Sequence, residues 1–140
     1  MINNDAANLN ETVRILDQLG QFSNLRELIL SGPIGRNTLP ELPKGLRVLS
    51  LEAASDLESI TNLPSNLQRL AVVDAPNLTL LCNDFPDKFQ DLTELVLSGC
   101  KSLPEVQLLN ILDGFRSMNL RDVDLSDCHL LTRLPNPFPS

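Results

Sequence analysis

The fold of this chain is decided by the stretch Leu92-Thr93-Glu94-Leu95-Val96-Leu97-Ser98-Gly99-Cys100-Lys101-Ser102-Leu103. Its leucines form one apolar side of a short extended segment, because alternate side chains of a strand share a face. The segment is expected to bend back at Cys100, and Leu103 and Val106 then return to the same interior. One copy has no opposing layer and cannot bury its apolar side alone, so the pattern must recur if it is structural.

The pattern recurs four more times. Openings of the form Leu-x-x-Leu-x-Leu, with Val at two of the fifteen positions, begin at residues 25, 46, 67, 92 and 120, which are 21, 21, 25 and 28 residues apart. The position fourteen residues after each opening is also apolar: Leu39, Ile60, Leu81, Val106 and Leu134. Such a period is typical of a solenoid, in which each unit buries its neighbour's apolar side. The sequence therefore predicts an α/β solenoid over residues 25–140, with five short parallel strands on its concave face.

Residues 1–24 are predicted to form a cap on the first unit. The first eight residues are expected to be loosely held, and a helix is predicted over about 9–19. Asn8 and Glu11 form a plausible capping pair for this helix. Its apolar residues recur at helical spacing: Leu9, Val13, Leu16 and Leu19. An uncapped solenoid would expose its end leucines and an open strand edge.

The convex side is predicted to mix extended and helical returns. Pro40 and Pro64 lie in the first two returns, where a fixed φ and a missing N–H disfavour an α-helix. The third return is longer and has room for a short helical turn near 86–90. The fourth return predicts a helix over about 104–115, because Pro104 suits a first helical position and apolar residues follow at helical spacing.

Bulk properties exclude several classes of function. The net charge of −7 disfavours binding to nucleic-acid phosphates and to anionic membranes, and no apolar run is long enough to span a bilayer. The N-terminus lacks the basic and apolar regions of a classical signal peptide, so an intracellular protein is expected. Three cysteines do not describe a disulfide framework. Cys100 and Cys128 fall in the same slot of adjacent units and are expected to be buried thiols, with a structural disulfide as the alternative.

Two groups of units resemble known repeats. The 21-residue units with Leu39-Pro40-Glu41-Leu42-Pro43 and Leu63-Pro64 look like the LPX-type repeats of bacterial effector proteins. The units with Leu97-Ser98-Gly99-Cys100-Lys101-Ser102-Leu103 and Leu125-Ser126-Asp127-Cys128-His129-Leu130-Leu131 are similar to repeats of plant intracellular immune receptors. Over residues 20–135 the chain thus resembles the leucine-rich-repeat family. The resemblance implies a right-handed solenoid that binds proteins, with no active site inside the repeats.

The ninth position of the units departs from the family pattern. The family usually places Asn or Cys there, and the side chain bonds backbone groups along the stack. Here the slot holds Pro33, Ala54, Ala75, Cys100 and Cys128. Because Ala and Pro side chains cannot donate, the first three bends must satisfy their backbone groups in another way, and they are expected to be less regular.

No catalytic, cofactor-binding or metal-binding residue is predicted, and the chain is not expected to be an enzyme. Cys82-Asn83-Asp84 is similar to the catalytic Cys-x-Asp of bacterial ubiquitin ligases that carry such repeats. However, no cation lies nearby in the sequence to lower the pKa of the thiol. His129 is the only histidine and forms a poor metal set with Asp127 and Cys128. No Gly-rich phosphate loop is present.

The predicted binding surface is the concave face, where the side chains between the leucines point outward. The residues expected to contact a protein partner are Arg26, Ile29, Arg47, Val48, Arg69, Ala71, Val73, Glu94, Val96, Arg121, Asp122 and Asp124. Arginine around a small apolar centre is typical of protein-contact patches. The alternative is an ordinary solvated face whose charged neighbours pair, each pair contributing under about 1 kcal/mol. The small residues Gly32, Ala53 and Gly99 suggest a shallow groove.

The leading hypothesis is therefore a protein–protein interaction module. The resemblance implies the partner-recognition region of a bacterial effector that is delivered into the host cytosol. One alternative is the substrate-recognition arm of a larger enzyme, such as a ubiquitin ligase. Another is a structural module that self-associates through its C-terminal end, where residues 135–140 show no cap.

Overall fold

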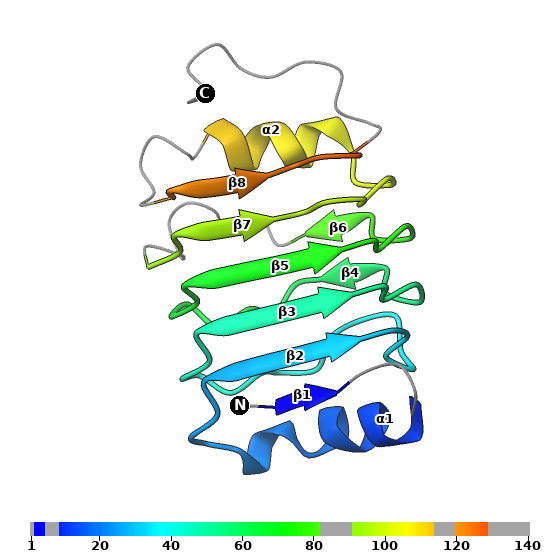
Figure 1. The fold of residues 1–140 in the computed structure, drawn as a ribbon, viewed down its shortest axis with the longest axis vertical. Helices are drawn as coiled ribbons and strands as arrows, with labels where there is room; N and C mark the ends of the chain where they lie inside the picture. Colours follow the sequence, from blue (N-terminus) through cyan, green and yellow to red (C-terminus); the bar gives the residue numbers. More distant parts are fainter. Residues whose placement is uncertain (1, 5–8, 82–90, 114–119, 129–140) are drawn as a thin grey trace.

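The computed structural model describes residues 2–4, 9–81, 91–113 and 120–128 (Figure 1). Their main element is a six-stranded sheet in the order β1-β2-β3-β5-β7-β8, and every strand pair is parallel. The predicted α/β class with a parallel sheet is confirmed. The strands are β1 (Ile2–Asn4), β2 (Glu27–Ser31), β3 (Val48–Glu52), β5 (Arg69–Val73), β7 (Glu94–Val96) and β8 (Asp122–Asp124). All except β1 lie at the five predicted openings.

The sheet is held in register by its buried leucines. The central leucine of each opening pairs with the next, in the file Leu28, Leu49, Leu70, Leu95 and Val123. The four leucines of this file are fully buried, and Val123 is half-buried. The first residue of every opening is buried as well. A slip of one residue would turn these side chains into water, so the apolar pattern specifies the register strongly.

The N-terminal residues differ from the prediction that residues 1–8 are loosely held. Ile2–Asn4 form β1 and pair in parallel with Leu28–Leu30 of β2. The reason is that β2 would otherwise present a row of unpaired backbone groups at the edge of the sheet, which any short extended segment can satisfy. In Figure 1, β1 lies between β2 and α1 (Leu9–Asp17).

A second, two-stranded sheet lies behind the main one (Figure 1). Its strands, β4 (Ser59–Ile60) and β6 (Leu80–Leu81), are parallel to each other. They run opposite to the main strands because they belong to the returns. Leu39, Ile60 and Leu81 are buried on this side and close the core opposite the inner file. The first two returns contain no α-helix, as their prolines indicated.

Helices cover the two ends of the described stack (Figure 1). Helix α1 lies where the sequence predicts a helix over about 9–19, and a 3-10 turn, η1 (Leu19–Gln21), follows it. Thr12, Leu16 and Leu19 are buried against the first unit. Helix α2 (Glu105–Asp113) occupies most of the predicted span 104–115. The prediction that Val106 returns to the interior was wrong, because it lies on this helix and is 63 % exposed, while Leu108 of the same helix is buried. The turn predicted near 86–90 lies outside the described residues. Among the described helices, none has both the length and the apolarity to cross a membrane.

The side chain of Gln107 on α2 completes the edge of the small return sheet. Its Oε1 accepts a hydrogen bond from the N–H of Leu81 at 2.6 Å, and its Nε2 donates to the carbonyl of Thr79 at 2.7 Å. A parallel strand would bond the residues on either side of Leu80 in the same manner. The carboxamide therefore replaces a peptide group of a missing strand, at the point where the return changes from extended to helical.

Replacing Gln107 with leucine is expected to lower the free energy of unfolding by about 1–3 kcal/mol, because two backbone groups lose their partner. The free energy of unfolding of Gln107→Glu should lie between those of the unchanged chain and of Gln107→Leu, since a carboxylate still accepts from Leu81 but cannot donate to Thr79. Urea unfolding measures both changes. Val106→Gln, at the neighbouring helical residue that is 63 % exposed, is the control and should stay within about 0.5 kcal/mol. Equal stability of Gln107→Leu and the control would contradict the proposed backbone mimicry.

The eighth residue of each unit, counted from its opening leucine, has a left-handed backbone. Positive φ angles occur at Gly32 (90°), Ala53 (58°), Asp74 (56°), Gly99 (74°) and Asp127 (59°). These residues hold the same position in the five units, where the chain turns away from the sheet. Gly is favoured there because it has no Cβ to strain this conformation, and Asp is tolerated because its short polar side chain can hydrogen-bond locally. The backbone turn accounts for the small residues at this position, and the shallow groove stays a prediction.

The first bend is the irregular one. Pro33 is exposed, and Ile34 fills the inner position in its place. The carboxylate of Asp56, from the next unit, accepts from the N–H groups of Ile34 at 3.0 Å and Gly35 at 2.7 Å. The carboxylate of the neighbouring unit thus accepts hydrogen bonds from backbone N–H groups of this bend, which the Pro33 side chain cannot do.

The second and third bends are regular, contrary to the prediction for the early units. Ala54 and Ala75 are buried at the ninth position, as Cys100 is in the fourth bend. Each carbonyl accepts from the N–H group three residues later, at 3.2, 3.3 and 3.5 Å respectively. An alanine methyl group is small enough to leave this bend unchanged.

Candidate functional site

The candidate site is the outward face of the main sheet, which carries the sequence-predicted contact residues. Strand pairing places them in columns, with Glu27, Val48, Arg69, Glu94 and Asp122 in one and Ile29, Ser50, Ala71, Val96 and Asp124 in the next. The exposed members are Arg26, Arg47, Arg121, Asp122 and Asp124, and the half-buried members are Ile29, Val48, Arg69, Val73, Glu94 and Val96. One sheet therefore brings together the whole predicted set.

Ala71 is the exception on this face, because its side chain is only 2 % exposed. Its methyl group is short, and Val96 lies beside it in register on β7. Arg69 and Val73 flank it along β5 on the same side. The taller neighbours cover the methyl group, so Ala71 offers almost no contact area and instead sets the low point of the face.

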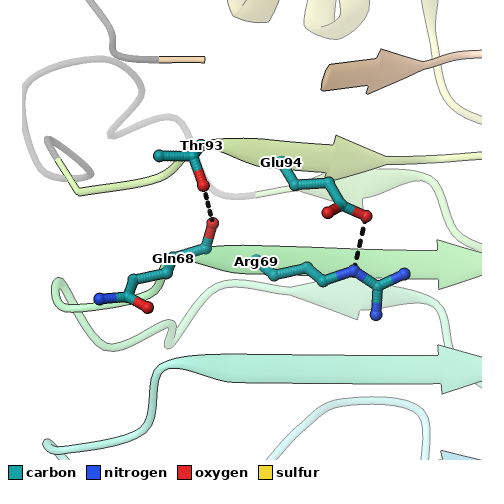
Figure 2. A network of polar contacts seen from close by, with 4 residues as sticks. All are labelled: Gln68, Arg69, Thr93 and Glu94. Carbon is teal, nitrogen blue, oxygen red and sulfur yellow. Dashed lines mark hydrogen bonds and ion pairs between the residues drawn. The ribbon is translucent and has the colours of Figure 1, made fainter. Parts of the chain in front are cut away.

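An ion pair crosses the middle of the face (Figure 2). Arg69 Nε lies 2.6 Å from Glu94 Oε2, and the two residues are direct partners in the sheet. Their side chains are 40 % and 33 % exposed, so the pair contributes less than about 1 kcal/mol. Its main effect is on shape and charge. The pair fixes both side chains over the sheet and neutralises Glu94, which also lies opposite Asp122.

The last strand forms an acidic end of the face. Asp122 and Asp124 of β8 are both exposed. The backbone N–H of Ser126 donates to Asp124 Oδ1 at 2.9 Å, and this bond, together with one from the Ser126 hydroxyl, holds the pKa of Asp124 below its ordinary value. Asp124 is therefore a carboxylate at neutral pH. Arg26 and Arg47 are exposed in the first two units, at the other end of the sheet.

The edge where the strands begin carries a separate set of polar side chains. Here the N–H of Arg47 donates to the carbonyl of Arg26, and Gln68, Thr93 and Arg121 continue the series at 2.7 to 2.9 Å. The hydroxyl of Thr93 also donates to the carbonyl of Gln68 at 3.2 Å (Figure 2). An open depression of about 920 Å³ lies over this edge. Its lining consists of Arg47, Asn66, Gln68, Asp91, Thr93, Leu120 and Arg121.

Five of these lining residues were not among the predicted contact residues, namely Asn66, Gln68, Asp91, Thr93 and Leu120. Asn66 and Asp91 each precede the opening leucine of their unit. Sequence reasoning considered only the positions between the leucines, and missed the polar residue directly before them. A comparison of the residues that directly precede the opening leucines could have identified Asn66 and Asp91.

Cys100 and Cys128 are buried free thiols, as expected. Cys100 Sγ donates to the carbonyl of Val72 at 3.5 Å, and Cys128 Sγ donates to the carbonyl of Leu97 at 3.0 Å. Burial, followed by the neighbouring Cys128, raises the pKa of Cys100 to about 12. Burial likewise raises the pKa of Cys128. Both groups are protonated at neutral pH and make poor nucleophiles, because the thiolate is the reactive form.

The remaining residues that were considered for catalysis or metal binding are Cys82, Asp84 and His129. All three lie outside the described residues. Within the described ranges, no group of three His, Cys, Asp or Glu side chains is arranged to hold a metal ion. What the described geometry offers is a patterned surface with an adjoining depression.

In comparisons with known proteins, this chain matches no family model, no curated protein and no solved structure.

Proposed function

We propose that this chain is a right-handed leucine-rich-repeat solenoid that binds a protein partner on the outward face of its sheet, without covalent chemistry. The LPX-like returns favour a more specific form of the proposal, in which the chain is the partner-recognition region of a bacterial effector. The observation that carries the proposal is the in-register sheet. It presents arginine, aliphatic and acidic side chains in fixed columns on one face.

The centre of this face supports binding more than a purely solvated role. Val48, Val73 and Val96 are half-buried on the outward side. The Arg69–Glu94 ion pair lies among them, because Arg69 is the sheet partner of Val48 and Glu94 is on the same strand as Val96. Apolar side chains at the centre with charged groups around them are typical of protein contacts, in which the partner removes the centre from water. The thiols of Cys100 and Cys128 are buried beneath this surface and protonated, so they offer no nucleophile to a partner.

Val96→Glu is expected to abolish partner capture, because a carboxylate in the centre would have to be desolvated on binding. The measurement is quantitative pull-down from lysates of the source cell and of eukaryotic cells, with capture reduced at least about tenfold. Val48→Glu, further from the acidic strand, should give the same result.

The matched control is Val106→Glu, which makes the same substitution at an exposed valine on α2. It should leave capture unchanged, and thermal unfolding should show that all three variants are folded. Proteins captured equally by Val96→Glu, Val48→Glu and the control would show that the outward face is not the binding surface.

A further inference from the structure

The depression at the strand-start edge is one part of a longer groove. A second depression of about 630 Å³ shares Asn66 with it, and a third of about 410 Å³ shares Glu41, Leu42 and Lys44 with the second. The three depressions adjoin one another through these shared lining residues, and together they are called the strand-start groove. It runs from Leu19 and Ser23, before β2, to Arg121, before β8.

The length of the groove suits an extended peptide. It crosses the starts of β2, β3, β5, β7 and β8, and neighbouring strands lie about 4.8 Å apart. Four such steps give about 19 Å, which is the length of roughly six residues of extended chain. A compact small molecule would occupy only one of the three parts.

The charge of the groove is unlike that of the whole chain. Arg47 and Arg121 line its largest part and Lys44 lines the other two, whereas the net charge of the chain is −7. Two carboxylates, Asp91 and Glu41, also line the groove, so its cations are in excess.

A further cation, Arg26, reaches the same edge, because a Cβ on Gly45 would collide with its guanidinium. Among the described residues, the arginines that form ion pairs are Arg36 and Arg69, and neither lines the groove. The cations of the groove are thus left without a carboxylate partner in the described part of the chain.

The groove also offers amides that match a peptide backbone. Asn66 Nδ2 donates weakly to the carbonyl of Lys44 at 3.3 Å, which leaves its Oδ1 available to accept. Gln68 directs its carboxamide away from Thr93 and lines the same wall (Figure 2). Each carboxamide can donate to a carbonyl and accept from an N–H, as Gln107 does elsewhere in this fold.

We propose that the strand-start groove binds an extended acidic peptide segment of the protein partner. Arg47 and Arg121 pair with carboxylates of that segment, and Asn66 and Gln68 bond its backbone. Guanidinium groups suit this task because they bind carboxylates with two parallel hydrogen bonds. This inference rests on the proposed function and states the chemistry of the partner.

The test selects peptides from a phage-displayed library of random twelve-residue sequences on the immobilised chain. The enriched peptides, labelled with fluorescein, are then measured by fluorescence anisotropy. We expect enrichment of Asp and Glu, and a Kd raised at least about tenfold by Arg47→Gln with Arg121→Gln. The control, Arg14→Gln with Lys101→Gln, changes the charge equally at exposed positions outside the groove and should alter Kd less than about twofold.

Enrichment of peptides without acidic residues would overturn the inference, and so would a failure to enrich any peptide. Equal loss of affinity in the two double variants would also overturn it, because the effect would then come from net charge. Val96→Glu separates the two proposals. If capture of a protein depends on Val96 while no peptide binds the groove, only the inference falls. If peptides bind the groove while capture of the protein partner is unchanged by Val96→Glu and Val48→Glu, the outward face is not the binding surface.

Discussion

Leu70→Ala is expected to lower the free energy of unfolding by about 2–5 kcal/mol. Leu70 is fully buried in β5, between Leu49 and Leu95 of the inner file. Alanine would leave a cavity that both neighbouring units line, and the strands cannot close it without breaking their register. Because small domains have only about 5–15 kcal/mol of stability, this single change removes a large part of it.

Urea or thermal unfolding followed by circular dichroism measures the effect. The matched control is Leu80→Ala in β6, where the side chain is 38 % exposed, and it should cost less than about 1 kcal/mol. The comparison tests whether the units share one core. If Leu70→Ala were as mild as the control, the continuous inner file could not be the main source of stability.

Gly99→Ala is expected to cost about 2–4 kcal/mol, for two reasons that add at one position. Its φ of +74° strains any residue with a Cβ by about 1–2 kcal/mol. The new Cβ would also lie 3.2 Å from the backbone N and Cα of Asp74 and would collide with its carboxylate, and such overpacking costs about 1–3 kcal/mol. Chemical denaturation of the two proteins gives the difference directly.

Ala53→Gly is the reverse experiment at the same position of an earlier unit, where φ is 58°. Glycine removes the strain of the left-handed backbone but adds flexibility to the unfolded chain, so the net effect should lie between about zero and 1 kcal/mol of stabilisation. Destabilisation of similar size in both variants would show that the sign of φ does not control this turn.

Ala53 and Gly99 hold the eighth position of their units, but their surroundings differ. Ala53 follows Gly32 in the column, so its methyl group has a glycine as one neighbour, whereas Gly99 has Asp74. The eighth position is thus restricted by the backbone everywhere and by side-chain contact only where the neighbouring unit is bulky. The strands keep the same register although the spacing between openings varies from 21 to 28 residues.

The sequence by itself determined the parallel strands, their register and the side of each strand that faces the core. The physical reason is that the leucines repeat at a spacing that only stacked units can bury, so the hydrophobic effect selects one arrangement. For the same reason, the order of the outward columns from Arg26 to Asp124 follows from the repeat spacing alone. The helices near 9–19 and 104–115 followed from the same kind of periodicity.

The tertiary structure decided everything that depends on contact between units. The pairing of Ile2–Asn4 with β2, the bonds of Gln107 and Asp56, and the burial of Ala71 all join residues more than twenty positions apart or depend on the height of neighbouring side chains. The strand-start groove belongs to this class as well. Periodicity specifies which way a residue faces, but hydrogen bonds and surface relief depend on distances of a few ångströms, which only the stacked units define.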